Sequence, residues 1–272
     1  MVSVFSNIKM NRFFLDTEYT NGNFYIGDIF DLALIAEKSG HIFHTLIKVS
    51  APLDNYIKFM CSITDEKLKK EGATFKHAFD AMIAFISTEK EKDDGEQPVT
   101  IIAHGGFTCD FPLLVINCLK NKCDISSMLS YRLVDTVKIL QKEAEVDTTL
   151  SLQCSLQSLS KKVFGESVHP SIHSASSDVI MLKNIFQYHP YRKILLKNMN
   201  NTYNINTIIW HLNAKMPISI VNIYNWYQNV SSLHHLVLLL STHIGNQKSS
   251  LNSTTVNKVA LYFYKYYFHS KI

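Results

Sequence analysis

The chain has 272 residues, of which 46% are apolar and 18% are charged, and this composition is typical of a globular protein with one large domain or one domain with an extension. The formal net charge of +4 is compatible with a polyanionic partner, but the Lys, Asn, Ile and Tyr bias of an AT-rich gene explains it equally well. Five cysteines without zinc-binding spacing, no signal-peptide core and no membrane-length apolar run predict an intracellular protein with reduced thiols and no membrane partner.

The first predicted strand ends in two acidic residues. Asp16 and Glu18 follow the apolar residues Phe13–Leu15 and precede the polar turn Thr20–Gly22. Side chains two apart on a strand project from the same face, so the two carboxylates are expected to converge. A converging pair suits a hard cation such as Mg²⁺. An acidic pair of this spacing is common, so taken alone the pattern favours two solvated residues at a strand end.

The segments that follow predict a mixed α/β domain. Residues 29–36 and 42–49 form a hairpin across Ser39-Gly40 and extend the first strand into a three-stranded meander. Two further strands, at 99–104 and 131–135, are separated from the meander and from each other by helical segments. The expected element order is βββααβαβαα, a five-stranded mixed sheet flanked by helices.

Local signals mark where helices in this part begin and end. Thr64, followed by two acidic residues, is a predicted N-cap, and Gly72 is expected to end that short helix. Thr74 is expected to cap the next helix. Pro112 is compatible with the first turn of a helix that runs to about Lys122.

The character of the chain changes after residue 192. The later residues are rich in Asn, Tyr and Ile and contain no acidic pairs, and helices are predicted over 217–226, 231–244 and 254–269. We therefore expect one domain over 1–192 and a helical C-terminal extension over 193–272. An alternative hypothesis is that 196–272 docks a partner or a second copy of the chain.

Acidic residues and one histidine recur at the ends of predicted elements. If the first and fourth strands are neighbours, these side chains meet at the carboxyl ends of the strands, where open α/β sheets bind ligands. Taken singly, each has a structural alternative as a helix cap or a solvated residue. The candidates are Asp16, Glu18, Asp110, His173 and Asp178.

Three segments resemble the exonuclease motifs of the DEDDh family. They are Phe14–Glu18, Ala103–Leu114 and His173–Val179, and the resemblance covers about residues 11–190. The spacing from His104 to Asp110, with the run Asp-Phe-Pro-Leu-Leu, resembles the three-prime repair exonuclease branch in particular.

The resemblance implies an RNase H-like fold and a metal-dependent 3′→5′ exonuclease that releases nucleoside 5′-monophosphates, with single-stranded or frayed DNA 3′ ends as substrate. It implies two Mg²⁺ ions, which Mn²⁺ can replace: Asp16 bridges both ions, Glu18 and Asp178 complete the first site, and Asp110 holds the second. His173 is then the general base, and an imidazole pKa near 6.5 suits that role at neutral pH.

The same resemblance implies a substrate path made of residues near these motifs, namely Thr17, Tyr19, Thr20, His104 and Gly105. His104 also suits a structural role at a strand end, and Asp135 is expected to cap the helix after the fifth strand. One departure is that Gly105 stands where the family usually has Asn, which puts the substrate grip in question. The open alternatives are RNA in place of DNA, a nucleic-acid-binding or polymerase-associated module without turnover, and a homodimer, since members of this branch are often dimers.

Overall fold

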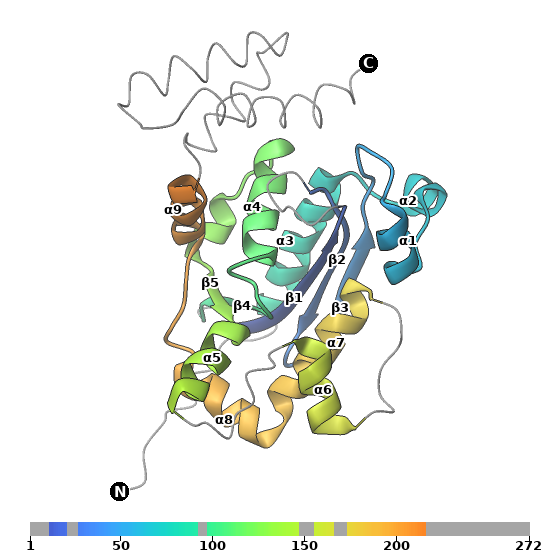
Figure 1. Cartoon of the computed structure of the whole chain (residues 1–272). Helices are drawn as coiled ribbons and strands as arrows, with labels where there is room; N and C mark the ends of the chain where they lie inside the picture. The colour runs from blue at the N-terminus through green and yellow to red at the C-terminus, as the bar shows by residue number, and fades with distance from the viewer. Residues whose placement is uncertain (1–10, 21–26, 92–96, 147–154, 166–172, 216–272) are drawn as a thin grey trace, which may run out of the picture.

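A computed structural model of the chain describes residues 11–20, 27–91, 97–146, 155–165 and 173–215 (Figure 1). The strands are β1 (Asn11–Tyr19), β2 (Ile29–Ala36), β3 (Ile42–Leu46), β4 (Val99–Ala103) and β5 (Arg132–Asp135). The helices of the first half are α1 (Asn55–Cys61), α2 (Asp65–Glu71), α3 (Phe75–Glu91) and α4 (Asp110–Lys120). Those of the second half are the 3₁₀ helix η1 (Ser126–Ser130), α5 (Thr136–Val146), α6 (Leu156–Phe164), α7 (Ala175–Gln187), α8 (His189–Asn198) and α9 (Ile205–Lys215).

The strands form one sheet in the order β3-β2-β1-β4-β5. Strands β1, β2 and β3 are antiparallel neighbours, whereas β4 pairs in parallel with both β1 and β5. This arrangement confirms the predicted meander, the helical crossovers and the adjacency of the first and fourth strands. Because β1, β4 and β5 run in the same direction, their carboxyl ends lie at one edge of the sheet.

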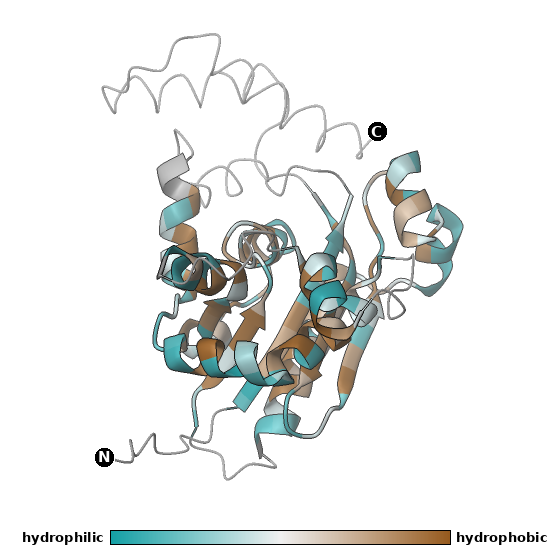
Figure 2. Cartoon of the chain, turned by 60° about the horizontal axis from the view of Figure 1, so that its bottom comes forward, coloured by the Kyte–Doolittle hydropathy of each residue, from teal (hydrophilic) through white to brown (hydrophobic). Residues whose placement is uncertain are grey.

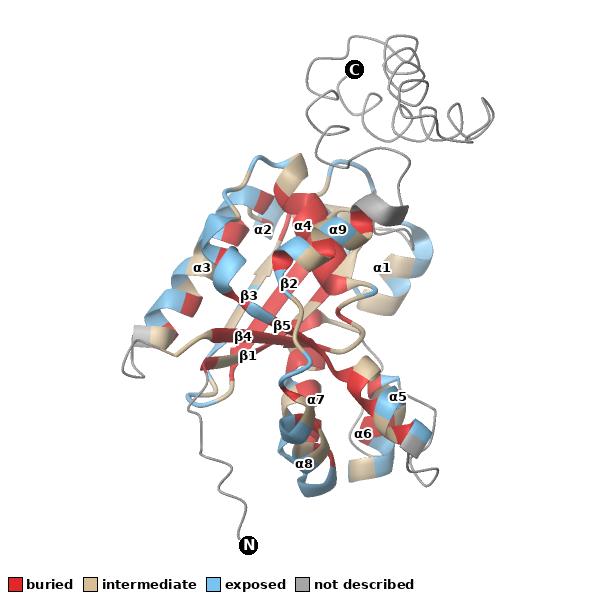
Figure 3. Cartoon of the chain, turned by 90° about the vertical axis from the view of Figure 1, so that its left-hand side faces the viewer, coloured by how far each residue is buried: buried red, intermediate tan, exposed pale blue. Residues whose placement is uncertain are grey.

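Helices cover both faces of the sheet, as Figure 3 shows, with α3, α4 and α9 on one face and α5 to α8 on the other. Successive side chains of β1 point to opposite faces of the sheet, so the strand contributes residues to the core on each face. Phe13 lies in the apolar core on the α3, α4 and α9 face, where it packs edge-on against Phe85. Phe14 lies in the core on the α5 to α8 face, where it packs against Phe186. Every residue of β2 is buried, and the apolar residues of the strands lie at the centre of the molecule (Figure 2).

The local helix signals are confirmed. The Thr64 hydroxyl accepts a hydrogen bond from the Lys67 amide, Gly72 is the C-cap of α2, and Thr74 accepts from the His77 amide at 3.3 Å. Cys61, Cys109, Cys118 and Cys123 are free, and Cys154 lies outside the described residues.

The boundary expected at residue 192 falls inside α8. Tyr203 pairs with Leu133 at the end of the sheet through two backbone hydrogen bonds of 2.8 Å. The described part of the expected extension, 193–215, therefore packs on the same core as the sheet, through Leu195, Met199, Ile205, Ile208 and Leu212. The three helices predicted beyond residue 216 lie outside the described residues. None of the described helices has the length and apolar character needed to cross a bilayer.

Candidate active site

The C-terminal end of β1 places three polar side chains on the two faces of the sheet. Asp16 and Glu18 share the face that α7 covers, as their spacing predicts, and both are partly buried. Thr17 points the other way and is 6% exposed. Its hydroxyl donates a hydrogen bond of 2.7 Å to Asp110 Oδ1, which ties β1 to the start of α4.

A tight turn after β4 delivers Asp110 to the same edge. Gly105 has φ +78°, a left-handed conformation that glycine adopts without strain, and its carbonyl accepts hydrogen bonds from the Thr108 and Cys109 amides. Asp110 follows as the first residue of α4 and is 4% exposed. The turn thus connects the buried strand β4 to α4, whose first residue carries a carboxylate.

Asp135, at the end of β5, holds this turn in place. Its carboxylate accepts hydrogen bonds from the Gly105 amide at 3.1 Å and from the Phe107 amide at 3.0 Å. It also accepts from the Val137 amide at 2.9 Å, which confirms the predicted cap of α5. His104 bonds through Nδ1 to the Thr136 hydroxyl at 2.8 Å, a contact of the structural kind that its strand-end position suggested.

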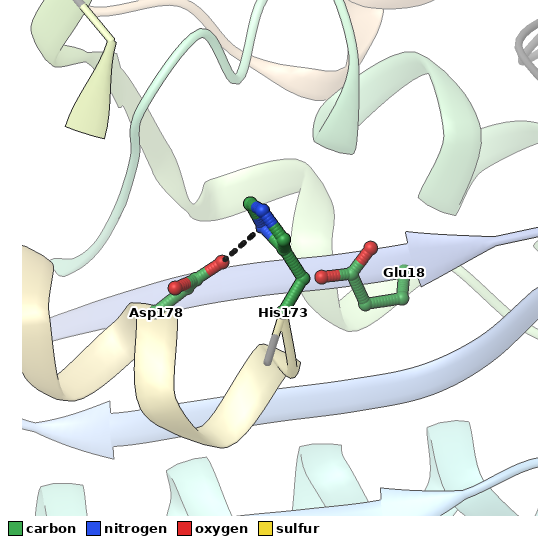
Figure 4. Close-up of side chains that lie close together, drawn as sticks. All are labelled: Glu18, His173 and Asp178. Atoms are coloured by element: carbon green, nitrogen blue, oxygen red, sulfur yellow. Dashed lines mark ion pairs between the residues drawn. The ribbon is translucent and has the colours of Figure 1, made fainter. Parts of the chain in front are cut away.

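The start of α7 supplies the remaining two candidates. The Ser174 side chain caps the helix by accepting from the Ser177 amide, and Asp178 lies in the first turn. His173 Nδ1 is 3.9 Å from Asp178 Oδ2, and Figure 4 shows the Asp178 and Glu18 carboxylates on either side of the imidazole. One ligand atom each from Glu18, His173 and Asp178 lie within 4.8 Å of one another, a spacing that a metal ion could bridge.

The electrostatics of the cluster show that its carboxylates repel one another. Burial, followed by the charges of Asp178 and Asp31, raises the pKa of Glu18 from 4.5 to about 8. Burial, and next the charges of Asp110 and Asp178, raise the pKa of Asp16 well above 3.8. Mutual repulsion of this kind is what a bound cation would relieve, so the donor set fits a divalent ion.

A thiol lies beside the cluster. The Cys61 side chain hydrogen-bonds to Glu18, and burial together with the Glu18 charge raises the pKa of this thiol to about 12. The other donors are carboxylate oxygens and one imidazole, a set that a divalent cation can use.

Three residues near the cluster were missed by the sequence analysis. Gln157, on α6, has its Nε2 atom 3.3 Å from His173 Nδ1. Asp31, the third residue of β2, is the register partner of Glu18 and is 5% exposed. Cys61 closes α1 beside Glu18. No signal found in the sequence connects Gln157, Asp31 or Cys61 to the cluster.

The residues predicted to line the substrate path lie on both sides of the cluster. Tyr19 hydrogen-bonds to the Cys109 thiol, and burial raises the pKa of its hydroxyl, so it remains neutral. Thr20 accepts a hydrogen bond from the Asp28 amide at 3.0 Å, which closes the base of the β1–β2 connection. Their proposed contact with nucleic acid remains a prediction.

The sheet order and its helical layers define a mixed α/β fold of the RNase H-like type, which solved exonuclease structures share. One is a 3′-exonuclease described for 3′-end-specific recognition of a histone mRNA stem-loop, at 13% identity and a TM-score of 0.53 over 67% of this chain and 63% of that one. A full-length 3′-exonuclease aligns at 14% identity and a TM-score of 0.51, over 69% of this chain and 81% of that one.

A third similar structure is the Exonuclease I of Methylocaldum szegediense, at 12% identity and a TM-score of 0.52 over 70% of this chain and 43% of that one. The chain thus spans less than two thirds of the length of the first and third of these proteins. No family model matches the chain, and no curated protein matches its sequence. At these identities the similarity establishes the fold, and function has to be argued from the site.

Proposed function

We propose that the chain is a metal-dependent 3′→5′ exonuclease that hydrolyses DNA from single-stranded or frayed 3′ ends. The observation that carries the proposal is the convergence of Glu18, His173 and Asp178 within 4.8 Å at the carboxyl end of β1. The charges of Asp16 and Asp110 act on the same cluster. The fold that brings these residues together is shared with 3′-exonucleases.

Each residue has a role that its position supports. Asp16, Glu18 and Asp178 would hold one divalent ion, and Asp16 with Asp110 would hold a second. Such ions supply the positive charge that stabilises the phosphorane-like transition state and the departing oxygen. Thr17 orients Asp110 through its hydrogen bond, so this carboxylate is preorganised before substrate arrives.

His173 would accept the proton of the attacking water. A proton on Nδ1, which lies 3.9 Å from Asp178 Oδ2, would leave Nε2 as the basic nitrogen that takes the proton. The water oxygen forms a bond to phosphorus while the bond from phosphorus to the 3′ oxygen breaks. The shortened strand keeps a 3′-hydroxyl, and the terminal nucleotide leaves as a 5′-monophosphate.

The test uses 5′-labelled single-stranded DNA, 3′-recessed duplex DNA and single-stranded RNA, each with Mg²⁺, Mn²⁺ or EDTA. We expect a ladder that shortens from the 3′ end with either metal and is absent with EDTA. Asp16→Asn should abolish the ladder, and His173→Ala should slow it by about 10²–10⁴-fold. The matched control is Asp80→Asn, which alters an exposed carboxylate paired with Lys76 in the first turns of α3.

RNA is the main alternative substrate, and one structurally similar exonuclease is described with an mRNA stem-loop. Faster shortening of RNA than of DNA would correct the substrate while leaving the reaction as proposed. A non-catalytic nucleic-acid-binding module is the second candidate, favoured by Gly105 in place of the family's usual Asn. Retained binding with no shortening of any of the three substrates would establish that module and reject the exonuclease.

A further inference from the structure

Asp31 is a buried carboxylate in an otherwise apolar strand, and both of its oxygens are engaged. Oδ1 lies 2.7 Å from His44 Nε2 on the edge strand β3. Oδ2 accepts a hydrogen bond of 3.2 Å from the Ala175 amide, the first residue of α7. Ala175 is completely buried, so Asp31 joins β2, β3 and α7 at a single point inside the molecule.

Asp31 places a negative charge beside the site carboxylates. It faces Glu18 across the β1–β2 pair, and, after burial and the charge of Asp178, its own charge contributes to the raised pKa of Glu18. Its own partners are the His44 imidazole and the N-terminus of α7, where a carboxylate meets favourable partial positive charge. All the other residues of β2 are apolar and buried, so a carboxylate at this one position points to a specific role.

We propose that Asp31 is a positioning residue that anchors the first turn of α7 to β2 and thereby sets His173 and Asp178 against Glu18. The inference rests on the proposed function, because the positioned groups are those assigned to metal binding and proton transfer. Ala175, whose amide Asp31 holds, lies two residues after His173 and three before Asp178. A displacement of about 1 Å at such groups is enough to reduce a reaction rate about 100-fold.

Two other contacts hold the same turn but cannot replace this anchor. The His173 amide donates to the Met60 carbonyl of α1 at 3.1 Å, and the Ser174 hydroxyl caps the helix locally. The bond from His173 to Met60 connects the residue before the helix to α1, and the Ser174 cap acts within the first turn itself. The Asp31 bond connects the helix start directly to the strand beside Glu18. His44, held at the other oxygen, fixes the orientation of the Asp31 carboxylate.

The test compares Asp31→Ala, which removes both acceptors, with Asp31→Asn, which leaves one acceptor for two donors. Four quantities are measured on the full chain: Mn²⁺ affinity by electron paramagnetic resonance, kcat and KM on a labelled DNA oligonucleotide, and hydrogen exchange of the α7 N-terminus. The control is Asp124→Ala, because Asp124 likewise accepts from a backbone amide, that of Ser126 at 2.9 Å, at an exposed position outside the site.

For Asp31→Ala we expect Mn²⁺ affinity and kcat each to fall about 10–100-fold, with KM nearly unchanged. The α7 N-terminus should exchange faster, and Asp124→Ala should leave all four quantities near wild type. Asp31→Asn should lose about 10-fold in Mn²⁺ affinity and show a smaller increase in exchange, since its carbonyl can still accept from Ala175. If the alanine variant does not fold, the asparagine variant decides by the same measurements.

The outcomes separate this inference from the proposed function. Wild-type Mn²⁺ affinity and kcat in a folded Asp31 variant would overturn the positioning role while leaving the exonuclease intact. A wild-type protein that binds Mn²⁺ but cleaves no nucleic acid would reject the exonuclease. In that case, weaker Mn²⁺ binding together with faster α7 exchange in Asp31→Ala would still support the anchor.

Discussion

Two helix starts bring carboxylates to the site, and the protein holds them in different ways. Asp110, at the start of α4, receives a hydrogen bond from Thr17, a neighbour on β1. The start of α7 is held through its backbone, by Asp31, Met60 and the Ser174 cap, while Asp178 itself faces Glu18 and His173. On the α4 side, the Asp110 carboxylate itself is held by a hydrogen bond. On the α7 side, the backbone at the helix start is held, and the helix places Asp178 at the site.

The acidities of the two sides reflect this difference. Burial raises the pKa of Asp110 to about 6, and the Thr17 hydrogen bond limits the rise by stabilising the charged form. Glu18, among other carboxylates, has its pKa raised to about 8. On the α4 side, a hydrogen bond therefore stabilises the ionised form of Asp110. On the β1–α7 side, full ionisation of the Glu18 carboxyl group depends on a cation.

The largest expected effect is a fall in metal-free stability as the pH rises. A carboxyl group whose pKa is raised on folding binds more protons in the folded state, so its contribution is complete below its unfolded pKa and is lost as the pH approaches its folded value. For Glu18 that window runs from about 4.5 to about 8, and the loss is on the order of a few kcal/mol. Urea denaturation in EDTA at pH 5, 6.5 and 8 measures it.

Saturating Mg²⁺ should flatten or reverse this trend, because binding favours the ionised carboxylates. Glu18→Gln should also flatten it, whereas Asp80→Asn should not. A metal-free stability that is constant between pH 5 and 8 would contradict the assignment of repelling, cation-free carboxylates to the β1–α7 side.

The second expected effect concerns the turn that starts α4, where two adjacent glycines differ in their surroundings. A Cβ on Gly106 would lie 2.7 Å from Ala103 Cβ and 2.7 Å from the buried Phe111 ring, whereas a Cβ on Gly105 meets nothing closer than 3.8 Å. Gly106→Ala should therefore cost about 1–3 kcal/mol by overpacking and displace Asp110. Gly105→Asn should cost less than Gly106→Ala, because its Cβ has room and Asn, although strained at this φ, adopts the left-handed conformation more readily than other larger residues.

Urea denaturation and Mn²⁺ affinity of both variants test this contrast. Equal destabilisation by the two substitutions would show that backbone conformation, rather than contact with Phe111, limits the turn. A gain of activity in Gly105→Asn would show that Gly105 weakens substrate binding.

The sequence predicted the parts of this site that are local. Asp16 and Glu18 follow from period-two alternation at the end of an apolar strand, and the caps at Thr64 and Asp135 follow from short-range hydrogen bonding. The parallel pairing of β1 with β4 could be inferred because an apolar strand after helical crossovers is typical of a buried parallel strand.

The parts that were missed depend on distant backbone groups. Asp31 interrupts an apolar run by one residue, and its partner is the amide of Ala175, 144 positions along the chain, which carries no side-chain signal. The boundary expected at residue 192 followed a change in composition. Beyond that residue, Ile205, Ile208 and Leu212 recur at apolar helical spacing along α9 and pack into the buried core.

The smallest expected effect separates the two sides directly. Thr17→Val removes the hydrogen bond to Asp110 and should cost about 1 kcal/mol at pH 8. The cost should be smaller at pH 5, because the bond stabilises the charged form of a group whose pKa is about 6. The same loss should raise the pKa of Asp110 further, so the acidic limb of the activity–pH profile should move to higher pH.

Ser174→Ala is the matched change on the other side, since it removes the α7 cap without touching a carboxylate. It should also cost about 1 kcal/mol, but with no dependence on pH between 5 and 8 and no shift of the activity profile. Urea denaturation at the two pH values and the pH dependence of kcat measure both variants. Equal shifts of the activity–pH profile by Thr17→Val and Ser174→Ala would show that the carboxylates on the two sides form one network. The proposed difference between the two helix starts would then be wrong.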